Sequence, residues 1–198
     1  MRTLITIAHK IDDFSEKLGT ISMYLVIATF FVGFANVLLR YVGRFIGIRL
    51  TSNLLIELQW YLYSLIFFFG FAYILKHGIN VRVDFWFANL SKKTQAWIDF
   101  IGHIISLIPF CLLGIWVTWN PILTSWGLRS DGTWGSWEMS PDPSGLPRAP
   151  IKSMVLLAFI SLLLQGISEM IKLYAILRDQ EELVADIRAK LDAPIRIE

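Results

Sequence analysis

The sequence predicts an all-α integral membrane protein with four transmembrane helices. Of its 198 residues, 55% are hydrophobic and only 17% are charged, and the mean hydropathy is +0.56. A soluble domain carries about 25% charged residues, so the apolar excess must contact something other than an internal core. A helix rising ~1.5 Å per residue needs about 20 residues to cross a ~30 Å hydrocarbon layer. Four mostly apolar runs are that long: residues 18–39, 54–75, 97–119 and 151–173.

Composition also excludes several classes of function. The net charge is only +2 and no run of Lys or Arg occurs, so we expect no nucleic acid partner. The single cysteine, Cys111, lies in an apolar run, which excludes an intramolecular disulfide and a thiolate metal site. No GxSxG, HExxH or phosphate-binding glycine loop occurs in a usable context. We therefore expect neither an enzyme nor a cofactor.

The N-terminal segment, residues 1–17, mixes both signs of charge with a helical apolar pattern. Its apolar residues recur every three or four positions: Leu4, Ile7, Ile11, Phe14 and Leu18. This pattern favours a short helix lying in the headgroup plane, apart from a membrane domain over residues 18–173. A frayed terminus is the alternative. The first span, 18–39, is uncharged and exceeds the 7–15-residue apolar core of a secretory signal, so we expect it in the mature protein.

The second and third spans each contain one notable feature. The second, 54–75, has a single ionisable residue, Glu57, near its start, and it ends abruptly at a Lys-His-Gly turn. The third, 97–119, contains Pro109. A proline ring displaces a carbonyl and removes one donor, so we expect a kink there.

The segment 120–150 differs in character from the spans. It contains three tryptophans and five of the seven prolines of the chain. Such dense turn chemistry favours a pinned, extended loop rather than a long helix. The fourth span, 151–173, follows it. Beyond that span, helical spacing persists among charges, which predicts a helical tail over residues 174–198.

The distribution of cations predicts the topology. Twelve of the eighteen Lys and Arg lie in the N-terminal segment, the link between the second and third spans, and the tail, with Lys172 at the end of the fourth span counted in the tail. Cytoplasmic segments carry the excess of Lys and Arg. We therefore expect both termini in the cytoplasm and the loop 120–150 in the periplasm.

Polar residues within the spans follow helical spacing, so each span presents one polar face that we expect to point toward protein. The ionisable residues lie near the two ends of the spans and none lies at mid-depth, where each would cost about 2.5–3.5 kcal/mol. This placement favours a structural role, in which these residues tie helices together or bind a partner subunit. The candidates are Asn36, Arg40, Glu57, Trp60, Arg82, Asp84, Asp99, His103, Arg148, Lys152 and Glu169.

Two other functions remain open. His77 and His103 could ligate a haem in a four-helix bundle, which would make the chain a b-type cytochrome anchor. However, His77 lies in a turn, and an i, i+4 hydrogen bond with Asp99 explains His103 more simply. A self-contained carrier or channel would need a polar midplane, which the spans lack.

Several stretches together resemble the small, DctQ-type membrane subunit of tripartite ATP-independent periplasmic (TRAP) transporters. The resemblance covers about residues 20–175, and each stretch is weak on its own. The stretches are residues 36–41 (NVLLRY), 56–61 (IELQWY), 76–84 (KHGINVRVD), 90–99 (LSKKTQAWID) and 141–148 (PDPSGLPR) with 150–152 (PIK).

The resemblance implies a subunit of a larger assembly in the bacterial inner membrane. In that family, a large permease subunit of many helices contains the substrate and ion sites. A periplasmic substrate-binding protein delivers the solute, here an organic acid or a related compound, and a sodium gradient drives import. The small subunit would be a non-catalytic scaffold in the lipid bilayer beside the large permease.

Overall fold

The computed structural model describes residues 2–79 and 87–178, and within them it confirms an all-helical membrane protein. Four helical stretches are long and apolar enough to cross a membrane: Arg2–Ile46, Asn53–His77, Lys92–Ser125 and Arg148–Leu177. The first two are α1 and α2. The third consists of α4 (Lys92–Gly102), a π-helical turn η1 (His103–Leu107) and α5 (Ile108–Ser125), and the fourth is α6.

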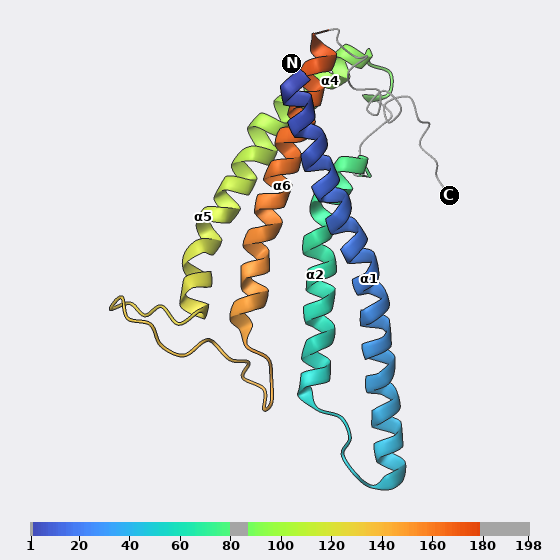
Figure 1. The fold of residues 1–198 in the computed structure, drawn as a ribbon, viewed down its shortest axis with the longest axis vertical. Helices are drawn as coiled ribbons and strands as arrows, with labels where there is room; N and C mark the ends of the chain where they lie inside the picture. Colours follow the sequence, from blue (N-terminus) through green and yellow to red (C-terminus); the bar gives the residue numbers. More distant parts are fainter. Residues whose placement is uncertain (1, 80–86, 179–198) are drawn as a thin grey trace.

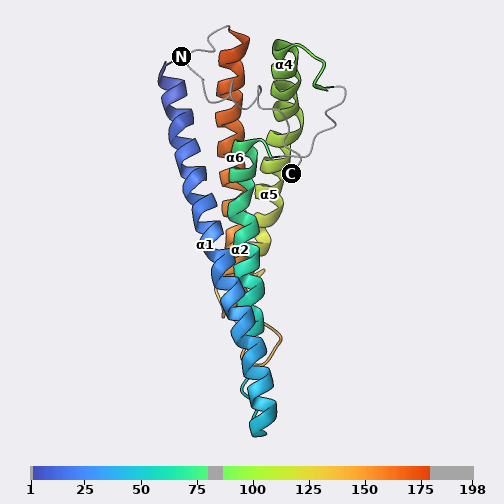
Figure 2. The same ribbon diagram turned by 90° about the vertical axis from the view of Figure 1, so that its right-hand side faces the viewer.

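The helices form an elongated bundle (Figure 1). The start of α1 and the end of α6 lie at one end, here called the terminal end. The loops 47–52 and 126–147 lie at the opposite end, here called the loop end. Figure 2 shows that the bundle narrows toward the loop end, where α1 and α2 extend furthest.

Helix α6 is the centre of the bundle. In its most apolar stretch 28% of residues are buried, against 6% in each of the other three spans. It packs against α1, α2, α4 and α5. The apolar side chains exposed on the other helices must therefore contact lipid or another membrane protein.

The N-terminal segment differs from the expectation of a separate helix in the headgroup plane. Helix α1 runs without interruption from Arg2 to Ile46, and its 45 residues span about 67 Å at ~1.5 Å per residue. The face that packs on the bundle is not the predicted apolar stripe, because Leu4, Ile7 and Phe14 are all exposed. Ile5 joins a buried cluster with Ala96, Leu173 and Ile176, and the buried Asp12 and Ser15 on the same side contact α6.

The third span is also longer than predicted and contains an irregular turn. The turn η1 ends two residues before Pro109, where we expected a kink. A π turn is one way for a helix to accommodate an interrupted hydrogen-bond ladder. The helix then continues through Pro121 to Ser125, so the loop covers 126–147 rather than 120–150. Of the predicted tail, only residues 174–178 lie within the described residues.

Candidate functional site

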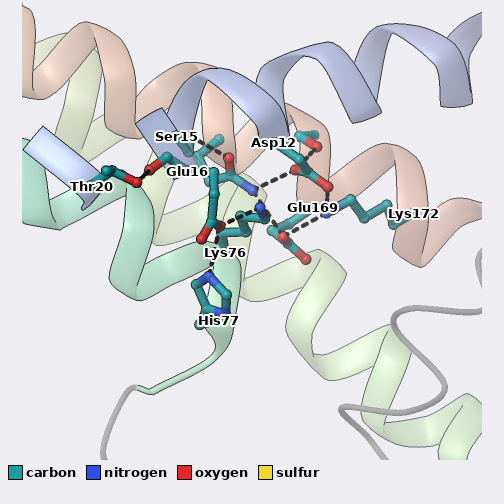
Figure 3. A network of polar contacts seen from close by, with 10 residues as sticks. Asp12, Ser15, Glu16, Thr20, Lys76, His77, Glu169 and Lys172 are labelled. Carbon is teal, nitrogen blue, oxygen red and sulfur yellow. Dashed lines mark hydrogen bonds and ion pairs between the residues drawn. The ribbon is translucent and has the colours of Figure 1, made fainter. Parts of the chain in front are cut away.

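The polar side chains gather into two clusters, one near each end of the bundle. The terminal-end cluster joins α1, α2 and α6 and consists of Asp12, Ser15, Glu16, Lys76, His77, Gln165, Ser168, Glu169 and Lys172 (Figure 3). The loop-end cluster joins the loop 126–147 to α2, α5 and α6.

Gln165 is the hub of the terminal-end cluster, and its side chain is fully buried. Its Nε2 donates to Asp12 Oδ1 at 2.9 Å and to Glu169 Oε1 at 3.0 Å. Its Oε1 accepts from the Ser15 hydroxyl at 2.6 Å. Both polar atoms of this buried amide thus have partners, and the bonds to Asp12 and Ser15 join α1 to α6, which matters because an unsatisfied buried polar group is costly.

Lys172 supplies a positive charge where α6 meets α1 in this cluster. Its Nζ lies 2.5 Å from Asp12 Oδ2 and 3.0 Å from Glu169 Oε1, and the residue is only 5% exposed. Ser168 Oγ lies 2.8 Å from Asp12 Oδ1 and 3.1 Å from the carbonyl oxygen of Ala8. The spacing of these residues along α6 places them on one face, and Asp12 and Ser15 share the facing side of α1.

Glu16 extends the same face of α1 toward α2. Its Oε2 accepts from Lys76 Nζ at 2.6 Å and lies 2.9 Å from His77 Nε2. The His77 ring also lies against Tyr73, with centroids 4.3 Å apart. The Lys-His-Gly turn that ends the second span is therefore attached to α1.

The loop-end cluster is built on Glu57, which is only 3% exposed. One carboxylate oxygen accepts from the Ser140 hydroxyl and the other from the backbone N–H of Leu146. A Cβ added to Gly145 would lie 2.8 Å from Glu57 Oε2, so the loop backbone passes close to the carboxylate. The charge at the start of the second span therefore pins the loop to α2.

Neighbouring contacts hold the same stretch of the loop. The Tyr61 hydroxyl donates to the carbonyl oxygen of Pro147 at 2.6 Å, and Asn53 Nδ2 donates to that of Pro143 at 3.1 Å. The Arg148 guanidinium lies over the Trp60 ring, 6.0 Å from its centroid. The expectation of a pinned loop matches these contacts.

Glu138 anchors the other half of the loop. Its Oε2 lies 2.5 Å from both Lys152 Nζ and Ser125 Oγ, which joins the loop to α5 and α6. The hydrogen bond from Lys152, and next that from Ser125, lower the pKa of the Glu138 carboxyl below its usual value. Beside it, Trp126 Nε1 donates to Ser153 Oγ at 2.8 Å and its ring packs edge-on against Trp137.

A polar depression of about 690 Å³ lies on the outer side of this loop. Its lining combines the end of α5 with the first turns of the loop, including Asn120, Arg129 and Asp131. The hydroxyl and backbone N–H of Thr133 lower the pKa of the Asp131 carboxyl by hydrogen bonding to it. The depression is hydrophilic and carries one charge of each sign.

The structure places the remaining predicted residues as follows. Asn36 is buried on α1 with its Oδ1 unpartnered, and Arg40 is exposed. His103 Nδ1 lies 2.6 Å from the backbone carbonyl oxygen of Asp99, so the i, i+4 contact uses the backbone. A carbonyl only accepts, so Nδ1 donates in this contact, and Nε2 is buried without a hydrogen-bond partner. Arg82 and Asp84 lie outside the described residues.

The haem alternative has little support in these positions. The Nε2 of His77 lies 2.9 Å from Glu16 Oε2, so this nitrogen already has a partner. His103 lies in η1, in a different helical stretch. Within residues 2–79 and 87–178, no hydrogen bond, ion pair or ring contact joins the two imidazoles. Those same ranges contain no group of three or more His, Cys, Asp or Glu placed to hold a metal ion.

Sequence reasoning missed the α1 half of the terminal-end cluster. Asp12, Ser15 and Glu16 were assigned to a headgroup-level helix, although they follow i, i+3, i+4 spacing. The complementary stripe on α6 was the available signal, because a buried Lys172 requires a carboxylate from a neighbouring helix. The loop partners of Glu57 had no such signal, since Ser140 and Leu146 are more than 80 positions away.

Comparison with known families provides independent information. The family model described as "Tripartite ATP-independent periplasmic transporters, DctQ component" matches residues 29–175. No curated protein and no solved structure matches the chain.

Proposed function

The chain belongs to the family of DctQ components of tripartite ATP-independent periplasmic transporters, and we propose that it is a scaffold subunit that supports the large permease. A DctQ component is a non-catalytic part of a transporter, and this one is a multi-pass membrane protein. A tripartite system implies partner components. We propose that these are a large permease, which moves the solute, and a periplasmic substrate-binding protein, which delivers it.

This proposal is supported by the finding that the polar side chains of the two clusters bond to one another and to the backbone. Secondary transporters build substrate and ion sites from broken helices and polar groups near the membrane midplane. Among the described residues of this chain, the two polar clusters lie toward the ends, and their carboxylates are bonded to neighbouring side chains or backbone. Gln165 has no free hydrogen-bonding group, and both oxygens of Glu57 accept from the loop. Such groups hold helices together and are not free to bind a solute.

Exposed aromatic residues on α1 offer a surface for the large permease. Phe30, Phe31 and Phe34 are each more than half exposed, and the Phe30 and Phe34 rings stack at 6.2 Å. They lie in the uncharged part of α1, where α2 covers only one side. Association of helices in a membrane depends on packing of this kind rather than on the hydrophobic effect.

The loop 126–147 offers a surface for the soluble partner. With both termini in the cytoplasm, as the distribution of Lys and Arg favours, this loop is periplasmic. It is fixed to three helices through Glu57 and Glu138, so it presents the polar depression in a defined position. We assign this face to the binding protein, an organic acid to the solute and a sodium gradient to the driving force.

Co-expression with candidate large permeases tests the proposal. An affinity tag on this chain should retain one permease, and proteoliposomes containing both proteins should import the solute when given its binding protein and a sodium gradient. Uptake should fall strongly when this chain is omitted. The proposal would be overturned if this chain alone moved solute in liposomes, or if the permease worked equally well without it.

A further inference from the structure

We propose that the loop end of α1 binds the headgroup of an anionic phospholipid through Arg40, Arg44 and Arg49. All three residues are exposed. Over residues 2–79 and 87–178, none of them has an acidic side chain within ion-pair distance. Three exposed, unpaired guanidinium groups within ten positions are available to bind an anion from outside the chain.

The end of α1 brings these residues together. Gly47 adopts a left-handed conformation (φ 73°), and the N–H of Ile48 donates to the carbonyl oxygen of Gly43 at 3.0 Å. This is the 6→1 bond of a glycine-terminated helix, and it turns the chain back over the last helical turn. A Cβ at Gly43 would lie 3.2 Å from Leu50 N, so the backbone on either side of Arg49 packs against the turn that carries Arg44.

The spacing of the other two arginines suits a headgroup layer. Arg40 and Arg44 are four residues apart and therefore share one face of α1, separated by about 6 Å along its axis. Arg40 is the first charge after the uncharged run 18–39. The polar region on each side of a ~30 Å hydrocarbon core is about 5–8 Å thick, which accommodates both side chains.

The surrounding side chains favour a lipid over an acidic protein surface. Large apolar residues alternate with the arginines and are exposed: Tyr41, Phe45, Ile46, Ile48 and Leu50. Phe45 is 90% exposed. Guanidinium groups bind phosphate oxygens in a bidentate manner, while aromatic rings prefer the boundary between headgroups and hydrocarbon. A phospholipid supplies both environments in the same layer.

The other cations of the loop end contact groups within the chain, although the buried Nε of Arg148 has no hydrogen-bond partner among the described residues. Lys152 pairs with Glu138, the Arg148 guanidinium lies over Trp60, and that of Arg129 packs against Gly135. The negative end of the α1 dipole favours Arg44 but acts only over the last turn. If the termini are cytoplasmic, these three arginines lie on the periplasmic side, where Lys and Arg are usually less frequent. A basic cluster that binds anionic lipid accounts for them.

Native mass spectrometry of the full chain in detergent tests the site by titration with phosphatidylglycerol or phosphatidylcholine. The wild type should prefer phosphatidylglycerol. The triple variant Arg40→Gln, Arg44→Gln, Arg49→Gln should lose at least about tenfold in apparent affinity for it. The charge-matched control, Arg2→Gln, Lys10→Gln, Lys17→Gln at the terminal end, should lose less than about twofold. Phe45→Ser should weaken binding about twofold to threefold without a change in charge.

Several results would overturn the proposal. One is a loss in the loop-end triple variant no larger than the loss in the control, and another is a Phe45→Ser variant that binds like the wild type. Displacement of phosphatidylglycerol by millimolar inorganic phosphate would show a site for free anions instead of lipid. A triple variant that keeps phosphatidylglycerol but no longer retains the large permease would show that the surface binds protein. Because the substituted side chains are exposed, the thermal midpoint of each variant should match the wild type.

Discussion

Lys172 Nζ lies 2.5 Å from Asp12 Oδ2, which joins the last helix of the bundle to the first. Both residues are less than one-tenth exposed. The contact explains why the N-terminal third of α1 is part of the bundle: a buried ammonium needs a carboxylate, and Asp12 is the one that α1 supplies. Glu169 and Gln165 complete the environment, so the cluster fixes the rotation of α1 about its axis relative to α6.

Removing the cation should therefore destabilise the bundle. Lys172→Met leaves two carboxylates buried without their counter-ion, and breaking a buried pair from one side costs roughly 3–5 kcal/mol. We expect a lower thermal midpoint for the purified protein. The control is Arg178→Met at the C-cap of the same helix, where the side chain is exposed and, among the described residues, contacts Tyr174; it should change stability by less than about 0.5 kcal/mol.

A second substitution separates the ion pair from simple loss of packing. The double variant Asp12→Asn, Lys172→Met removes both charges of the pair, so no carboxylate at position 12 is left buried without its cation. It should therefore be more stable than Lys172→Met alone. If the double variant is less stable than Lys172→Met, the Asp12–Lys172 pair is not the source of the effect.

The loop should detach from α2 when Glu57 can no longer accept two hydrogen bonds. Glu57→Leu keeps a side chain of similar size but accepts no hydrogen bond, so the Ser140 hydroxyl and the Leu146 N–H both lose their acceptor. We expect faster limited proteolysis within residues 139–147. Asp142→Asn, in the same stretch and exposed, serves as the control and should be cut at the wild-type rate.

The Glu138 contacts predict a pH dependence of stability. Lys152 and Ser125 lower the pKa of Glu138 in the folded state below its usual 4.5. A carboxyl whose pKa is lower in the folded than in the unfolded state stabilises the fold fully above its unfolded-state pKa. This contribution is lost as the pH falls through the folded-state pKa. When the pH is lowered from 5 to below 4, the free energy of unfolding should therefore fall more for the wild type than for Glu138→Gln. The pair is over one-third exposed, so the difference should stay below about 1 kcal/mol; parallel pH curves would contradict this assignment.

Close approach of α1 and α2 depends on Gly19. A Cβ at this position would lie 2.6 Å from Cγ of the Tyr73 ring, so Gly19→Ala should force the helices apart and cost about 1–3 kcal/mol. Gly19→Ala combined with Tyr73→Leu should recover part of the loss. The control is Gly70→Ala in α2, where the nearest atom is 3.9 Å away; it should be neutral or slightly stabilising because alanine favours a helix. Equal destabilisation by both alanines would argue against the packing explanation.

The membrane spans, and the position of the charged residues near their ends, could be predicted from the sequence because both depend on local hydropathy. Glu57 could be recognised as a structural charge because it is alone in an apolar run. Its partners could not be recognised, since a turn-rich loop can fold back in many ways and the contact joins distant positions. The contacts of Asp12 could not be predicted for a different reason: the apolar stripe of Leu4, Ile7 and Phe14 is exposed, and the face that packs on α6 is mixed in polarity.

The final prediction concerns the assembled transporter. Glu57→Leu removes the acceptor that holds the loop, while leaving any solute site in the large permease untouched. We expect a lower yield of the co-purified complex or a lower maximal rate of sodium-driven uptake, with the KM for solute and the preference among organic acids unchanged. Uptake by proteoliposomes of the wild-type and variant complexes measures each quantity, and Asp142→Asn again controls for changes in the loop. A complex that assembled normally but changed its solute preference would place Glu57 beside the transported molecule and contradict a scaffold role.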